Sequence, residues 1–354
     1  MKKSHAILTG ITICLLLAGI ITAITNRNRI YAWTLGDVNA LYAEAKSLYD
    51  ARKYKDARPL FQKLADIDSA SYSQFLLGDM YYRGLGLDSA DYAKAFMMFV
   101  KSANNNNTDA HNNLGVMYLY GHGVQADYYK AFRYFQYAAA NGNSQAQVGL
   151  GTMYRHGWGV DRNSSKAFDW YRKAANLGNV DAMNNMGYMY ASGFGKLMSA
   201  ESALYWYQKA AALNHPKAMY NIGALYAEGR GVERDLHKCA EWLTKAALLG
   251  ETTAQFNLGN MYYLGKGVER DLVKCAEWLN KAALLGEVTA QFNLANMYYL
   301  GKGVERDLDK AAMWYSLAKE QGHRNAGRFL KHLEDHQDIL ELDSNFTIRL
   351  IPER

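Results

Sequence analysis

The sequence predicts an all-α solenoid, built from antiparallel helix pairs that repeat along most of the chain. A block of 36 residues recurs with little change, since residues 229–271 match residues 265–307 at all but five positions. A fixed period between 20 and 50 residues is typical of solenoids, whose repeats bury their apolar faces against one another. The 354 residues include only three prolines, and a proline inside a helix costs about 3 kcal/mol. Both observations favour helices throughout the repeated region.

Each repeat divides into two short helical patterns that are separated by a loop rich in glycine. In the sixth repeat, Ala254, Leu258 and Met261 fall on one face of the first pattern, and Cys275 and Leu279 fall on one face of the second. The loop glycines supply the positive φ that ends the first helix. The second helix then follows a residue that suits an N-cap, which is Asp91, Asp127, Asn163, Asp235, Asp271 or Asp307. Seven such repeats cover residues 73–322.

The repeats are flanked by segments that we expect to cap them. Residues 37–70 have the tyrosine, alanine and phenylalanine spacing of one tetratricopeptide helix pair. Residues 323–354 begin with an amphipathic helix whose outer face is charged, as the end of a solenoid requires for solubility. The tail Phe346–Ile351 has the pattern of a loose strand.

The repeat resembles the Sel-one-like repeat (SLR) family, which is related to the tetratricopeptide repeats. The third repeat carries the resemblance at Ala146, Leu150, Gly151, Tyr154, Gly157, Gly159, Val160, Lys166, Ala167, Trp170, Tyr171, Ala174, Ala175 and Gly178. The fourth departs from it, because Lys196 and Leu197 replace the valine loop and Asn214 replaces the closing glycine. The resemblance implies a right-handed α/α superhelix of SLR and TPR-like helix pairs, and a non-catalytic role as a scaffold for other proteins.

The N-terminal residues 1–30 contain a candidate membrane segment. Residues 6–25 carry no charge and follow Lys2 and Lys3, and a helix of about 20 residues spans a hydrocarbon core of ~30 Å. The sites for signal cleavage are poor, so we expect an anchor in the inner membrane with periplasmic repeats. Arg27 and Arg29 oppose this orientation, because positive charge prefers the cytoplasmic side. A cleaved signal peptide and a periplasmic or secreted chain remain the alternative.

The distribution of charge argues against nucleic-acid binding, and the positions of the cysteines argue against disulfide bonds between repeats. The net charge is +6, but four of the basic residues flank the N-terminal segment and the rest form no cluster, so nucleic-acid binding is not expected. Cys239 and Cys275 are 36 residues apart, at equivalent positions of neighbouring repeats. Helices there lie about 8–10 Å apart, which is too far for a disulfide. We expect both cysteines to be buried.

Two sets of residues are candidates for contact with a protein or peptide partner. Loop residues with aromatic or cationic side chains are typical interface anchors, and they are His122, Arg155, His156 and Trp158. Asparagines recur on the first helices at Asn113, Asn185, Asn221, Asn257 and Asn293. They either bind a peptide backbone or satisfy polar groups between helices, and repetition favours the second interpretation. Because the last three repeats are near copies, a distinctive partner should bind within residues 37–217.

No catalytic, cofactor or metal site is expected, and the chain should be a monomer. Some cysteine-rich SLR proteins are credited with β-lactam hydrolysis, but their paired cysteines are absent here. The single Ser-x-x-Lys motif, Ser316 to Lys319, lies in mid-helix without its companion motifs. His332 and His336 have a spacing that can hold a metal, yet the acid is misplaced for a zinc protease. A cysteine-poor relative of those hydrolases, or a secreted effector that binds host proteins, is the alternative.

Overall fold

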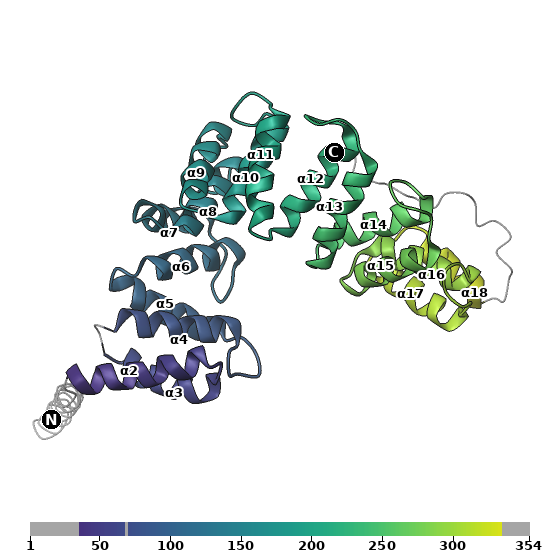
Figure 1. The fold of residues 1–354 in the computed structure, drawn as a ribbon. Coiled ribbons are helices and arrows are strands. Elements are labelled where there is room, and N and C mark those ends of the chain that lie inside the picture. Colours follow the sequence, from purple (N-terminus) through teal and green to yellow (C-terminus); the bar gives the residue numbers. More distant parts are fainter. Residues whose placement is uncertain (1–34, 68–69, 335–354) are drawn as a thin grey trace, which may run out of the picture. The chain divides into compact units, whose positions relative to one another are not determined.

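The structure is a computed structural model that describes residues 35–67 and 70–334, and regular structure within these ranges is entirely helical (Figure 1). The predicted all-α class is therefore confirmed. The first pair is α2 (Leu35–Asp50) and α3 (Tyr54–Ala65), and the last helix is α18 (Ala326–Glu334). The repeats supply α4 (Ser71–Arg83), α5 (Tyr92–Asn104), α6 (Thr108–Tyr120), α7 (Tyr128–Ala140), α8 (Ser144–His156), α9 (Ser164–Asn176), α10 (Val180–Ser192), α11 (Ala200–Ala212), α12 (Pro216–Glu228), α13 (Leu236–Leu248), α14 (Thr252–Leu264), α15 (Leu272–Leu284), α16 (Val288–Leu300) and α17 (Leu308–Glu320).

The chain divides into two compact units, with the boundary between Arg162 and Asn163. Within each unit, every helix packs antiparallel against the helix before it, so that sequence neighbours are also neighbours in space. Alanines fill the contact faces, and larger side chains such as Phe61, Phe99 and Tyr315 close the gaps between the helices. The core of each unit is therefore a continuous stack of helix pairs.

One set of contacts fixes the loop in five of the seven repeats, and the sixth repeat shows it. Gly265 ends α14 in the left-handed conformation, with φ 65°. The Asp271 carboxylate accepts a hydrogen bond of 3.0 Å from the backbone N–H of Lys274 and so caps α15. The Lys274 ammonium lies 3.4 Å from the other Asp271 oxygen and 5.4 Å from the centre of the Tyr262 ring. These four residues therefore join the two helices of the repeat.

The N-caps of the second helices confirm the sequence prediction, including the repeat that departs from the pattern. Each predicted aspartate or asparagine accepts a hydrogen bond from the backbone three residues on. In the fourth repeat Ser199 caps α11, and Ser202 stands where other repeats have lysine. The third and fourth repeats, capped by Asn163 and Ser199, therefore lack the aspartate–lysine ion pair that the cap forms in the other five repeats.

Both cysteines of the repeats are buried and free, as predicted. Cys239 is 4% exposed and Cys275 is fully buried. Burial raises the pKa of the Cys239 thiol to about 11 and that of Cys275 to about 12. Both therefore stay protonated at neutral pH and behave as small apolar side chains.

The segments predicted at the two ends of the chain lie only partly within the described residues. Helix α18 packs through Ala326 and Phe329, and the Phe329 ring lies 5.6 Å from that of Tyr315. The segment 1–30, the strand at 346–351 and His336 lie outside the described residues. No helix in the described ranges has the length and apolar character that a membrane span requires. Within the same ranges, no group of three or more possible ligands could hold a metal ion.

Candidate interaction surface

Six rings gather at one edge of the first compact unit, where the loops of neighbouring repeats meet the helices. They form two equivalent sets of three, each made of the last residue of a first helix, the residue between the two loop glycines that follow it, and the first residue of the second helix of the repeat before. We call this set the aromatic platform, and it comprises Tyr92, Tyr120, His122, Tyr128, His156 and Trp158.

The first half of the platform is a stack centred on His122. Its ring lies 4.9 Å from the Tyr92 ring at an interplanar angle of 16°. The Tyr120 ring lies 5.7 Å from the imidazole at 26°. The Tyr82 hydroxyl lies 2.8 Å from Nδ1 of His122, within hydrogen-bond distance, and holds the imidazole in place. Tyr120 is 63% exposed, so the stack opens to solvent.

The second half repeats this arrangement around Trp158. Tyr128 lies 5.8 Å from the indole at 15°, and His156 lies 4.6 Å from it at 16°. The Arg155 guanidinium donates to Nε2 of His156 over 2.9 Å, which requires the neutral imidazole to carry its proton on Nδ1. Partial burial lowers the pKa of His156, and the positive charges of Arg155 and Arg162 lower it further. The ring is therefore neutral at pH 7.

The close approach of each loop to the previous repeat brings these rings together. A Cβ atom on Gly123 would lie 2.7 Å from the Tyr92 carbonyl oxygen, and one on Gly159 would lie 2.3 Å from that of Tyr128. Both glycines also have positive φ, of 71° and 66°. Only glycine permits this contact, and it places the preceding loop residue against the first turn of the earlier helix.

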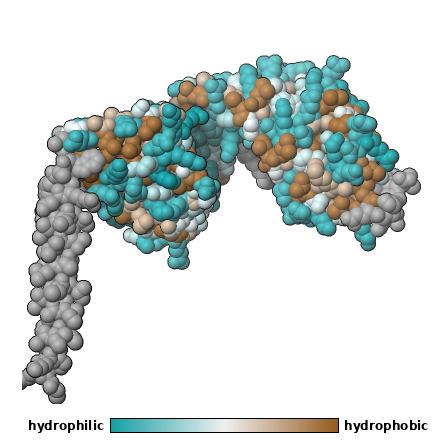
Figure 2. Space-filling model, turned by 90° about the horizontal axis from the view of Figure 1, so that it is seen from below, coloured by the Kyte–Doolittle hydropathy of each residue, from teal (hydrophilic) through white to brown (hydrophobic). Residues whose placement is uncertain are grey.

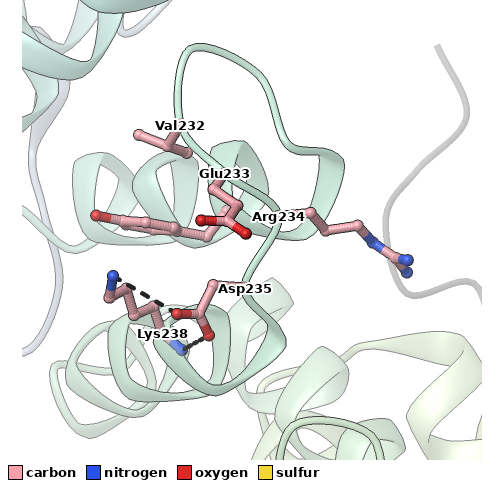
Figure 3. Close-up of a pocket in the computed structure, with 6 residues that line it drawn as sticks. Val232, Glu233, Arg234, Asp235 and Lys238 are labelled. Carbon is pink, nitrogen blue, oxygen red and sulfur yellow. Dashed lines mark hydrogen bonds and ion pairs between the residues drawn. The ribbon is translucent and has the colours of Figure 1, made fainter.

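The equivalent edge of the second compact unit has a different chemistry. Leucine replaces tyrosine at the start of α13, α15 and α17, and the loop residue is Arg230, Lys266 or Lys302. Figure 3 shows a pocket that the same loop of the fifth repeat forms with the helices beside it. The pocket has a volume of about 390 Å³ and is lined by Tyr226, Val232, Glu233, Arg234, Asp235 and Lys238. Asp235 caps α13 and pairs with Lys238, whose ammonium lies 5.4 Å from the Tyr226 ring. These polar groups satisfy one another, so the pocket serves the fold.

Apolar side chains also reach the surface of the second compact unit, and Figure 2 shows hydrophobic patches among hydrophilic ones on one face of the molecule. Leucines at the C-terminal ends of four second helices are 47% to 69% exposed, and they are Leu177, Leu213, Leu248, Leu249, Leu284 and Leu285. They offer no polar group that would orient a ligand. The platform combines apolar area with hydroxyl, imidazole and indole groups and is the stronger candidate.

The asparagine row is divided by burial. Asn257 is 2% exposed and Asn293 is 1% exposed, so neither side chain is accessible to a partner, and these two predicted contacts are withdrawn. Asn113, Asn185 and Asn221 are half-buried. Asn221 donates a hydrogen bond of 3.0 Å to Asn184 on the neighbouring first helix. This contact favours the second interpretation, in which the asparagines satisfy polar groups between helices.

The sequence-based candidates His122, His156 and Trp158 lie in the platform, and Arg155 lies beside it. The tyrosines that complete the two stacks were not among them. A signal was present: the helix after an N-cap aspartate begins with tyrosine at Tyr92 and Tyr128, where the fifth to seventh repeats have leucine.

The sequence matches the Sel1 repeat family in seven consecutive segments, 71–107, 108–143, 144–179, 180–215, 216–251, 252–287 and 288–323. The chain belongs to the Sel1 repeat family. The predicted resemblance is confirmed, and the first segment begins two residues earlier than the predicted start at residue 73.

Solved structures with the same fold include two Sel1-type proteins. A Sel1 repeat protein from Oxalobacter formigenes is 30% identical with a TM-score of 0.64, over 88% of this chain and 90% of that protein. A protective antigen of uropathogenic Escherichia coli strains, with an SLR fold, is 33% identical with a TM-score of 0.60, over 75% of this chain and 56% of the antigen.

A curated relative is the ERAD-associated E3 ubiquitin-protein ligase component HRD3B of Arabidopsis thaliana. It is 47% identical over 49 residues, which are 14% of this chain and 8% of the relative. The chain therefore spans less than a tenth of that protein, and the likeness concerns the repeat alone.

Proposed function

We propose that this Sel1 repeat protein is a non-enzymatic scaffold, which binds a protein or peptide partner through the aromatic platform of its first compact unit. The observation that carries this proposal is the exposure of rings that are already ordered. Tyr92, Tyr120 and Tyr128 are 38%, 63% and 47% exposed, yet each is stacked in place. Rigid aromatic side chains make good interface anchors because little conformational entropy is lost when they bind.

Membership of the Sel1 repeat family supports a binding role, since solenoids offer extended surfaces for other proteins. The Arabidopsis relative is named as a component of a ubiquitin ligase, which is an assembly of several proteins. For this chain we propose a monomer that is anchored in the inner membrane by residues 1–30, with its repeats in the periplasm. N-terminal sequencing of the mature protein tests the anchor, because a cleaved chain would lack residues 1–30.

The central experiment uses the tagged full chain as bait in extracts of its own cells. The double variant Trp158→Ala/His156→Ala should lose the captured partner while its circular dichroism and unfolding midpoint stay unchanged. Tyr205→Ala is the matched control, because Tyr205 is 51% exposed but lies in the second compact unit. Capture should survive in this control.

A deletion variant that removes one of the near-identical repeats, residues 252–287, should still capture the partner. If this deletion abolishes capture while the double variant is silent, the binding surface lies in the second compact unit and the proposal is wrong. Hydrolysis of nitrocefin by the full chain would support the hydrolase alternative instead. Ser316 lies within α17, where no turn exposes it as a nucleophile.

A further inference from the structure

The two stacks of the platform differ in charge, and this difference indicates what kind of partner they fit. Around Trp158 the third repeat has Arg155, Asp161 and Arg162. At the same three positions around His122 the second repeat has neutral residues, which are Leu119, Gln125 and Ala126. One stack is therefore neutral, and the other has a net positive charge beside it.

We propose that the platform binds an extended peptide segment, with a carboxylate side chain at the Trp158 stack and an apolar side chain at the His122 stack. This inference rests on the proposed function and names the chemistry of the partner. It differs from a purely apolar contact, because it requires one side chain of the partner to carry a negative charge.

Arg162 is the residue best suited to receive the carboxylate. Its side chain is exposed and makes no ion pair or hydrogen bond with the residues that the structure describes. A guanidinium can bind a carboxylate through two parallel N–H donors, a geometry that lysine cannot provide. Arg155 adds positive charge from α8, and Asp161 is the one acid of this loop. Both arginines act on the same place, since each lowers the pKa of His156.

The distance between the stacks sets the spacing of the two side chains on the partner. The stacks occupy equivalent positions of adjacent repeats, and α6 and α8, the first helices of those repeats, contact each other. Neighbouring helices lie about 10 Å apart, and a peptide in the extended polyproline II conformation rises about 3.1 Å per residue and presents every third side chain on the same side. The apolar and acidic side chains should therefore be about three residues apart.

The test uses the full chain and a set of fluorescein-labelled decapeptides, in which the glutamate lies one to six positions after the leucine. Each peptide is paired with a copy that has glutamine in place of glutamate. Binding is measured by fluorescence anisotropy. We expect the glutamate peptides with a spacing near three to bind at least about ten-fold more tightly than their glutamine copies, as expected for hydrogen bonds between charged groups.

Variants locate the effect on the platform. Arg162→Gln should remove the preference for glutamate and leave binding of the glutamine peptides unchanged. The matched control is Arg133→Gln, because Arg133 is an exposed arginine on α7 of the same compact unit, away from the platform positions. It should keep the preference for glutamate.

The outcomes separate this inference from the proposed function. Equal binding of the glutamate and glutamine peptides, tighter binding of the glutamine peptides, or no binding by any peptide would overturn the acidic-peptide inference. If capture of the cellular partner still depends on Trp158 in that case, the proposed function stands. If capture does not depend on Trp158, both proposals fail.

Discussion

A buried amide in the sixth repeat allows a sharp test of the packing. Asn260 is fully buried, and neither its oxygen nor its nitrogen has a hydrogen-bond partner among the described residues. Asn296 holds the equivalent position in the seventh repeat, where its oxygen accepts a hydrogen bond of 2.5 Å from the Tyr315 hydroxyl. The residue equivalent to Tyr315 in the sixth repeat is Leu279. The substitution Leu279→Tyr should therefore supply the missing partner.

The size of the effect follows from the same comparison. A buried polar group without a partner costs about 1–3 kcal/mol. There is space for the ring. Leu279 packs against Gly259, which has no side chain, and in the next repeat the fully buried Tyr315 fits even though the equivalent residue is the larger Ala295. Some of the gain is lost to repacking around the larger side chain, so we expect Leu279→Tyr to raise the free energy of unfolding by about 1–2 kcal/mol.

The variant Leu279→Phe is the matched control, since it adds the ring without the hydroxyl. Urea unfolding followed by circular dichroism, together with amide exchange in α14 and α15, should place the tyrosine variant above the phenylalanine variant. The converse change, Tyr315→Phe, should cost about 1–3 kcal/mol because it leaves the Asn296 oxygen unpaired. Equal midpoints for the two variants at residue 279 would show that the hydroxyl does not reach Asn260 and would refute this reasoning.

Three further predictions concern the repeat as a folding unit. Gly187→Leu should lower the free energy of unfolding by about 1–3 kcal/mol, because a Cβ atom there would lie 2.5 Å from the Tyr207 ring; an unchanged urea midpoint would contradict it. His215 caps α12 by accepting from the backbone N–H of Ala218, so His215→Ala should cost about 0.5–2 kcal/mol in urea unfolding, whereas His215→Asn should be neutral. The pKa values of the capping aspartates are lowered by hydrogen bonds from the lysine three residues on, so their stabilisation is complete above the ordinary pKa near 4 and is lost as the pH falls through the lower folded values. Thermal midpoints measured against pH should fall in that acid range, and less steeply when asparagine replaces Asp91, Asp127, Asp235, Asp271 and Asp307.

Much of the fold could be predicted because its determinants are local and recur in every repeat. The glycine that ends a first helix and the residue that caps a second helix lie within a few positions of each other. The predicted repeat starts were late by two residues for a physical reason. The apolar pattern begins at the first inward-facing residue, such as Ala110, whereas the helix begins at Thr108 after its cap Asn107.

The candidate site was less accessible to sequence reasoning, because it depends on contacts between repeats. His122 and Trp158 could be recognised as loop residues, but Tyr92 and Tyr128 lie 30 residues before them and join them only through the loop approach. The burial of the asparagines also depends on contacts between repeats and could not be predicted from the sequence. Asn221 is half-buried beside the short side chain of Asn184, whereas Asn257 lies beside Tyr220 and is almost fully buried. Equivalent positions therefore differ according to the size of a side chain one repeat away.

The Sel1 repeat separates the residues that fold it from those that can vary its surface. His122 stands between Gly121 and Gly123, and both glycines are fixed by positive φ and by the close approach of the loop. The residue between the two glycines is bound by neither requirement, and in this chain it is leucine, histidine, tryptophan, phenylalanine, arginine or lysine. The aspartate and lysine that fasten the loop lie elsewhere, at the N-cap of the second helix and three residues after it. Because the residue between the glycines is held by neither requirement, a substitution such as Trp158→Ala can report on binding without a large loss of stability.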